Sequence, residues 1–193
     1  PMTVRLVHQV VSDTMIAGIL VSSAFGLAAA VVFWRWLEQQ GMEGRTRVVA
    51  FAALMLYPYG WYLYGVVHSD SMFLTLVVAA CLLIERDRLV AAGLVGALAT
   101  ATRPTGMAVI PGLIVLGLVH DGVLRVPDGA SGLVERFRIP VHLDRSRFRL
   151  RSIAPALSGL GLGGWCLYLW VRFGDPLAFS HNQEVYHPGG LPL

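Results

Sequence analysis

The sequence predicts an all-α membrane protein, a polytopic bundle of transmembrane helices. The mean hydropathy is +0.63 and only 14% of the 193 residues are charged, which is too few to cover the surface of a soluble domain. Residues 15–33 and 153–171 are uncharged runs of 19 residues, and residues 48–67 form another of 20. Each run is long enough to cross the roughly 30 Å hydrocarbon core of a bilayer.

We expect residues 1–193 to form one membrane domain that is part of a longer protein. The chain opens with Pro1 and Met2, an order that does not look like a natural start. Further spans are therefore expected outside this stretch, both upstream and downstream.

The positions of the arginines predict how the chain is threaded. Short loops rich in arginine stay on the cytoplasmic side of a membrane. Arginines flank the loop near residues 35–47, occupy the turn 85–88 and crowd the long loop 120–151, whereas residues 57–71 hold none and 172–193 hold only Arg172. The first three connections are predicted to be cytoplasmic, and the other two extracytoplasmic.

This orientation requires an even number of crossings between the turn 85–88 and the long loop. Residues 89–101 and 107–119 must then form an up-and-down pair around Arg103-Pro104-Thr105-Gly106. Arms of 13 residues make a shallow hairpin whose tip lies inside the protein, where broken backbone is tolerated beside protein or water. Pro104 and Gly106 suit such a break, so we expect short, Pro/Gly-interrupted helices around an outward-facing cavity.

The basic loop 120–151 is predicted to determine topology beside anionic lipid headgroups, and no nucleic-acid partner is expected. In the next span, Gly159 and Gly163 predict a face of small residues for close helix packing.

Two polar sites interrupt the mostly apolar stretch 48–119, His68-Ser69-Asp70-Ser71 and the hairpin tip at Arg103. Fourteen residues separate Asp70 from the turn 85–88, and fourteen more separate that turn from Arg103. Each stretch spans roughly 21 Å as a helix, so Asp70 and Arg103 are predicted to lie at similar depth below the outer face. Charges there are costly and mark a cavity or a pathway.

Each of these sites has a structural and a functional interpretation. In the structural interpretation, Ser69 or Asp70 only caps the following helix; in the functional one, the acid orients sugar hydroxyls and assists proton transfer. For Arg103, the structural interpretation is an intramembrane ion pair with Asp70, and the functional one is that its planar guanidinium binds a lipid phosphate.

Other polar and aromatic residues are less specific. The cluster Tyr57, Tyr59, Trp61, Tyr62 and Tyr64 fits an interfacial aromatic belt, or rings on which a sugar stacks. Three histidines and two acids are also candidates for metal ligands, namely His68, His181 and His187 with Asp70 and Asp175, but their spacings match no metal-ligand pattern, so no metal and no cofactor is expected.

An ordered series of motifs resembles the PIG-V-type mannosyltransferases of the GT-C class, especially their bacterial members. A Pro-interrupted segment, Leu56-Tyr57-Pro58, leads to His68-Ser69-Asp70-Ser71-Met72-Phe73, where the family typically has Tyr-Ser-Glu-Ser-Leu-Phe. Thr102-Arg103-Pro104-Thr105-Gly106 follows, and then Arg172-Phe173-Gly174-Asp175-Pro176-Leu177-Ala178-Phe179. The resemblance extends over most of the chain, from about residue 1 to residue 183.

The resemblance implies a GT-C-like enzyme that transfers mannose from a polyprenyl-phosphate donor to a glycolipid or glycan acceptor on the extracytoplasmic face of the cell membrane. It implies a principal catalytic acid upstream of Pro1, which leaves Asp70 a supporting role. Arg103 would bind the donor phosphate, while His68, Ser69 and Tyr64 contact the substrates and Asp175 shapes the cavity mouth. The sequence also leaves open a transporter or lipid flippase, which uses broken helices and buried charges as well, and a non-catalytic membrane scaffold.

Overall fold

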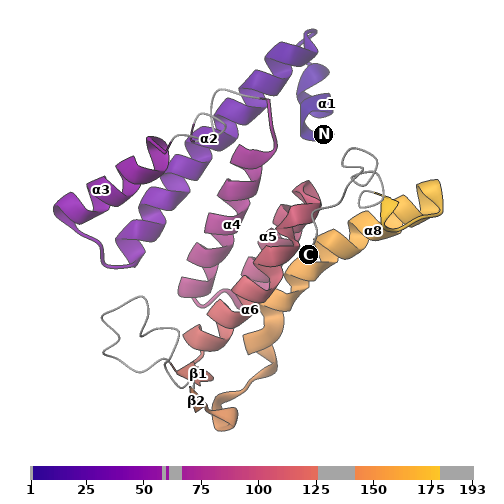
Figure 1. Cartoon of the computed structure of the whole chain (residues 1–193). Coiled ribbons are helices and arrows are strands. Elements are labelled where there is room, and N and C mark those ends of the chain that lie inside the picture. The colour runs from indigo at the N-terminus through magenta and orange to yellow at the C-terminus, as the bar shows by residue number, and fades with distance from the viewer. Residues whose placement is uncertain (1, 58–59, 61–66, 126–141, 179–193) are drawn as a thin grey trace, which may run out of the picture.

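The computed structural model describes residues 2–57, 60, 67–125 and 142–178. Over these residues the protein is all-α, as predicted, with seven α-helices, several 3₁₀ turns and one short pair of antiparallel strands (Figure 1). The helices are α1 (Met2–His8), α2 (Thr14–Gln39), α3 (Gly44–Met55), α4 (Asp70–Glu85), α5 (Leu89–Thr102), α6 (Val109–His120) and α8 (Gly159–Phe173). The remaining elements are η2 (Pro104–Ala108), β1 (Leu124–Arg125), β2 (His142–Leu143), η3 (Arg145–Arg147) and η4 (Leu150–Ser158).

Two helices are long and apolar enough to cross a membrane. One is α2, with 26 residues, and the other is the continuous helix Leu150–Phe173, in which η4 runs into α8 over 24 residues. The helical runs predicted at 15–33 and 153–171 are thereby confirmed. The run 48–67 starts within α3, which ends at Met55, and most of its second half lies outside the described residues.

Helix α2 packs along α4, and the two helices run in the same direction (Figure 1). It begins after Asp13, whose Oδ1 accepts the backbone N–H groups of Met15 and Ile16 at 2.7 and 3.3 Å, as expected of an N-cap. Midway along α2, the Oγ1 of Thr75 donates to the carbonyl of Phe25 at 2.8 Å. The first half of α2 therefore lies beside the start of α4 near Asp70, and the end of α2 lies beside the end of α4.

Helices α5 and α6 form the predicted up-and-down pair, with η2 as the turn between them (Figure 1). Arg103 leaves α5 in an extended conformation (φ −148°, ψ 132°), and its carbonyl accepts the N–H of Gly106 at 2.9 Å. A Cβ on Gly106 would lie 3.1 Å from the ring of Phe73 and 3.2 Å from the Cα of Thr100. Glycine therefore lets the turn pack against both α4 and α5.

A seam of small residues joins α5 to the long helix Leu150–Phe173. A Cβ on Gly161 would lie only 1.8 Å from the carbonyl oxygen of Ala97, so the two backbones touch at this point. Close by, the Oγ1 of Thr100 donates to the carbonyl of Ser158 at 2.6 Å. Seams of this kind are typical of helices that pack without large side chains between them.

The prediction that Gly159 and Gly163 form this seam is wrong. A Cβ on Gly159 would make only an ordinary contact at 3.9 Å, and one on Gly163 would meet nothing within 4 Å. Gly161 is two residues from each, which is roughly 200° around a helix. The contact face is thus on the opposite side from the one predicted.

The core and the outer surface have the same apolar chemistry. A buried cluster joins α4, α5 and α6, namely Ala80, Ile84, Leu89, Ala92 and Leu113. Large apolar side chains are also exposed along the outside of the helices, including Leu27, Leu94, Leu98, Val115, Leu167 and Val171. So many exposed large apolar side chains are unusual for a monomeric soluble protein.

The arginine-rich connections meet at one end of the helices, which we call the basic end. The side chain of Gln40, after α2, donates to Glu85 at the end of α4 at 3.2 Å. Arg151, at the start of the long helix, bonds to Asp87 in the α4–α5 turn at 3.2 Å. The predicted grouping of these connections on one side is confirmed, whereas residues 126–141 of the long loop lie outside the described residues and the described rest of the loop forms β1, β2 and η3.

Candidate functional site

Asp70 and Arg103 meet at the end of the helices opposite the basic end, which we call the outer end. Asp70 is the first residue of α4, and Arg103 directly follows α5. The two helices are joined by a tight turn in which Asp87 has a positive φ of 58°. Because α4 and α5 run similar lengths from this turn, an Nη1 N–H of Arg103 donates to Oδ1 of Asp70.

The surroundings of this ion pair are partly dry. The side chains of Arg103 and Asp70 keep 37% and 27% of their accessible surface, so the pair is neither sealed in the core nor fully solvated. The guanidinium carbon lies 5.9 Å from the centre of the Phe73 ring, a distance at which a cation is attracted by the ring face. A guanidinium carries five N–H donors, so one contact to Asp70 does not exhaust its capacity.

Ser69 and Ser71 flank Asp70 but do not act as caps in the way predicted for Ser69. Ser69 stands at the N-cap position with helical backbone angles (φ −80°, ψ 0°), and its hydroxyl makes no capping hydrogen bond. An N-cap residue normally has extended backbone angles, which direct its side chain toward the free amides of the first helical turn. The helical angles of Ser69 do not. The Oγ of Ser71 is buried without a hydrogen-bond partner among the described residues.

His68 is exposed just before α4. Its Nδ1 lies 3.1 Å from the carbonyl oxygen of Val67, and its own carbonyl accepts the hydroxyl of Ser22 at 3.4 Å. His68 therefore stands near Asp70 in the chain and ties the entry of α4 to α2.

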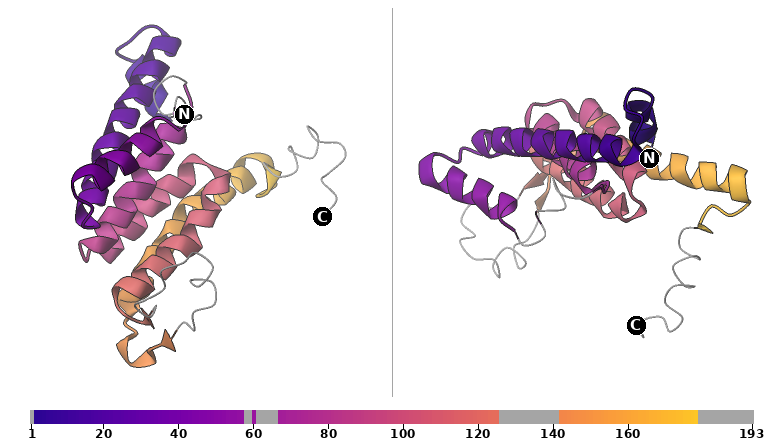
Figure 2. Two further views of the ribbon diagram at one scale, coloured as in Figure 1. Left: turned by 60° about the vertical axis from the view of Figure 1, so that its left-hand side comes forward. Right: turned by 90° about the horizontal axis from the view of Figure 1, so that it is seen from above.

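The other predicted site residues lie elsewhere. Tyr64 is outside the described residues, as are Tyr59, Trp61 and Tyr62, and Tyr57 is exposed. Asp175 follows α8, whose C-terminal end projects beyond the other helices (Figure 2). There its Oδ1 accepts the N–H of Leu177 at 2.9 Å, so the position of Asp175 at a cavity mouth stays a prediction.

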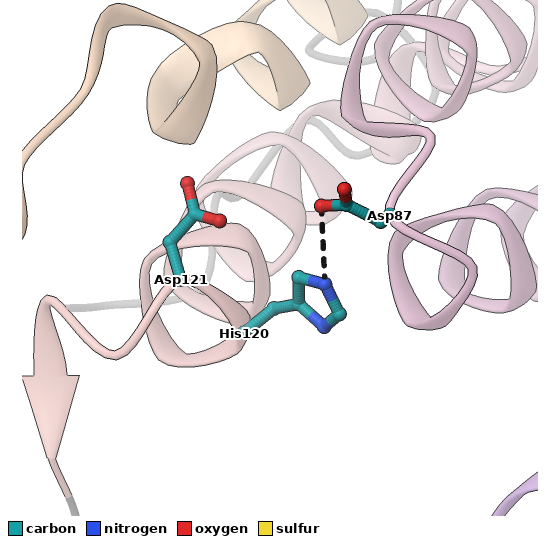
Figure 3. A group of neighbouring side chains, drawn as sticks. All are labelled: Asp87, His120 and Asp121. Atoms are coloured by element: carbon teal, nitrogen blue, oxygen red, sulfur yellow. Dashed lines mark ion pairs between the residues drawn. The ribbon is translucent and has the colours of Figure 1, made fainter.

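A second cluster of charged side chains lies at the basic end, and the sequence interpretation missed it. Arg151 donates to Oδ2 of Asp87 at 3.2 Å and to Oδ1 of Asp121 at 3.0 Å. The other oxygen of Asp121 accepts the hydroxyl of Ser152 at 2.5 Å. His120 points toward Asp87, with its Nε2 3.6 Å from Oδ1 (Figure 3).

The chemistry of this cluster is that of an ion-pair network. One ligand atom each from Asp87, His120 and Asp121 lies within 4.8 Å of the others, a spacing that would suit a metal ion. The guanidinium of Arg151 already binds both carboxylates, however, and supplies the positive charge that a metal would bring. The residues present therefore fit a metal ion poorly.

The sequence did hold a signal for this cluster. Asp87 lies in the turn 85–88, Asp121 follows the arm 107–119, and Arg151 precedes the run 153–171. The predicted threading brings all three to the same face, although it does not say which acid the arginine would bind. The chain has no significant match among protein-family models, curated proteins or solved structures.

Proposed function

We propose that this chain is part of a multi-pass membrane glycosyltransferase of the GT-C class. It would transfer a mannosyl residue from a polyprenyl-phosphate donor to a glycolipid or glycan acceptor on the extracytoplasmic face. The contact between Asp70 and Arg103 at the outer end is the observation on which this proposal depends. The motif series around both residues, which resembles the PIG-V-type mannosyltransferases, gives the reaction class.

Arg103 is proposed to hold the phosphate of the donor. During transfer the bond between the sugar and the phosphate breaks, and negative charge develops on the leaving phosphate oxygen. A guanidinium donates two parallel hydrogen bonds to such a group, and fixed donors at a developing charge lower the barrier most. Phe73 and the α5–η2 backbone hold the guanidinium in place before the donor arrives.

Asp70 and Ser69 are proposed to contact hydroxyls of the sugar or of the acceptor. The acceptor hydroxyl attacks the anomeric carbon and gives its proton to a carboxylate that acts as the general base. We assign that principal base to a residue upstream of this chain, so Asp70 orients Arg103 and the hydroxyls and does not itself take the proton.

The apolar surface and the charge distribution support the membrane placement in this proposal. The exposed faces of α2 and of the long helix Leu150–Phe173 would contact lipid. The basic end would face the cytoplasm, and the outer end would open toward the extracytoplasmic side. An outward cavity at Asp70 and Arg103 is part of the proposal.

One alternative draws on the same contact. An acid and an arginine that already bind each other also suit a purely structural role in a membrane scaffold. The two interpretations differ in whether the orientation of the charges matters, because a structural pair survives reversal and a phosphate site does not.

The test is transferase activity of the full-length protein with a radiolabelled polyprenyl-phosphate mannose donor. Three variants are compared with the parent protein: Arg103→Ala, Asp70→Asn and the double reversal Asp70→Arg with Arg103→Asp. The proposal predicts loss of activity in Arg103→Ala and in the reversal. Activity near that of the parent in both single variants would contradict the proposed roles. A fully active reversal would show that the ion pair has only a structural role, and a parent protein without transferase activity would favour the scaffold.

A further inference from the structure

A polar pocket of about 450 Å³ opens at the basic end. Arg147, Arg149 and Arg151 line it together with Asp87, His120 and Asp121. Its walls come from the α4–α5 turn, the end of α6 and the segment that leads through η3 into η4. Pockets for small ligands have volumes of about 300–1,000 Å³, so this pocket has the size of a binding site.

The three arginines of the pocket differ in whether an acid binds them. Arg151 is bound by Asp87 and Asp121, and Arg147 lies 3.5 Å from Asp144. Among the residues that the structure describes, Arg149 forms no ion pair, although it lines the pocket. An uncompensated arginine in a polar pocket favours an anion, and a phosphate group is the anion that a guanidinium binds best.

An apolar groove of about 290 Å³ adjoins the polar pocket. Leu89, Val90 and Ala91 at the start of α5 line it, and it shares Asp87 and Arg151 with the polar pocket. The side chain of Val90 is 54% exposed there. A polar pocket and an apolar groove thus lie side by side at the level of the basic end.

We propose that this double pocket binds an anionic phospholipid of the inner leaflet. Arg149 would bind the headgroup phosphate, and the first carbons of an acyl chain would lie along Val90. The inference rests on the membrane placement given under the proposed function, but not on the transferase reaction. Basic pockets between helices on the cytoplasmic side are typical sites for anionic headgroups, and the pairing of charge with an apolar groove favours a lipid over a free phosphate.

The test measures lipid binding by the full-length protein purified in detergent micelles. Dioctanoyl phosphatidylglycerol is titrated and its dissociation constant is taken from microscale thermophoresis. Dioctanoyl phosphatidylcholine serves as the uncharged control, and inorganic phosphate serves as the headgroup without chains. We expect phosphatidylglycerol to bind more tightly than both, with an affinity that falls as salt is raised.

Two pairs of variants assign the binding to the pocket. Arg149→Gln should weaken phosphatidylglycerol binding about fivefold, the effect of one arginine near an anionic surface, whereas Arg145→Gln removes the same charge outside the pocket and should have little effect. Val90→Asn should weaken lipid binding without changing phosphate binding, and Leu94→Asn, one turn further along α5, is its exposed apolar control. All four side chains are exposed, so folding should be kept.

Three results would overturn the inference. These are equal effects of Arg149→Gln and Arg145→Gln, equal binding of the two phospholipids, and phosphate binding as tight as that of phosphatidylglycerol. The transferase assay does not enter, because Arg149 is far along the helices from Asp70 and Arg103. A failure here would therefore leave the proposed reaction standing, and loss of the proposed reaction would leave the lipid site standing.

Discussion

The two ends of the molecule use the same ion pair, a carboxylate with a guanidinium, in different ways. At the basic end Arg151 binds two acids from two connections, and the side chain of Asp121 keeps only 4% of its accessible surface. At the outer end, Asp70 is the only acid among the described residues that binds Arg103, and both side chains keep about a third of their surface, 37% and 27%. The first arrangement is saturated, whereas the second has room for a further partner.

This difference indicates that the cluster around Arg151 at the basic end is structural. Asp121 bonds to Arg151 and Ser152, so both of its oxygens are occupied, and the cluster holds α6 to the start of the long helix. Arg103 instead lies at an interrupted hairpin tip beside an aromatic ring, and Ser71, next to Asp70, has a buried hydroxyl with no hydrogen-bond partner within the described part of the chain. Buried charges that are not fully enclosed by partners concentrate at functional sites in membranes.

The largest expected effect is on the proposed reaction at the outer end. If the protein is the proposed transferase, Arg103→Ala should lower kcat of the full-length protein about 100- to 1,000-fold, the usual cost of removing one fixed donor from a developing charge. Arg103→Lys keeps the charge but loses the planar fork, so its loss should be smaller. Steady-state kinetics with the mannosyl donor measures both variants. A lysine variant as impaired as the alanine variant would show that the positive charge of Arg103 does not contribute to the reaction.

A substitution in the seam near the outer end should mainly change stability. Gly161→Ala would force a Cβ to within 1.8 Å of the Ala97 carbonyl and 2.4 Å of the Thr100 hydroxyl. Overpacking of a close contact typically destabilises a protein by about 1–3 kcal/mol, and a clash with backbone this close should lie at the upper end of that range. Gly163→Ala is the matched control, because nothing lies within 4 Å of its Cβ position.

Thermal unfolding in detergent compares the two glycine variants at one fixed scan rate, because the midpoint of an irreversible transition depends on the scan rate. Gly161→Ala should unfold at a clearly lower temperature than Gly163→Ala. Equal midpoints would mean that α5 and the long helix do not approach as closely as this seam requires.

At the basic end, a change of charge should lower stability without lowering kcat. Asp121→Asn removes the charge from a hydrogen bond of the kind that contributes about 1.5–3 kcal/mol. The control is Asp144→Asn, whose side chain is 31% exposed and whose partner Arg147 is more exposed still, so its effect should be within about 1 kcal/mol. A drop in kcat with unchanged Tm in Asp121→Asn would remove the distinction between the two ends.

Much of the frame that brings Asp70 to Arg103 was predictable from spacing. Equal stretches on either side of the turn 85–88 place both residues at one end, because both stretches rise at the same rate per residue. The break at Pro104 also follows from local chemistry, since proline removes a helical donor. The arginine-rich connections likewise predicted that three segments meet at one end.

Two features depended on tertiary geometry that spacing does not determine. The contact face of the long helix depends on its rotation, and the 3₁₀ stretch η4, with Pro155 inside it, shifts that rotation away from a regular helical count. The choice of Asp87 and Asp121 as partners of Arg151 depends on side chains from three connections coming within about 3 Å. No local pattern around any one of them carries that information.

The smallest expected effect comes from a pair of serines, one at each end. Ser152→Ala removes a buried hydroxyl that donates to Asp121 at 2.5 Å and accepts the N–H of Arg149 at 3.3 Å, so we expect a loss of about 1 kcal/mol. Ser69→Ala removes a hydroxyl that makes no capping hydrogen bond, so its effect on unfolding should stay within about 0.5 kcal/mol. Because the proposed function has Ser69 contact a substrate hydroxyl, the same variant should raise KM for a substrate. A Ser69 variant that loses stability and keeps its KM would make the outer end as structural as the basic end.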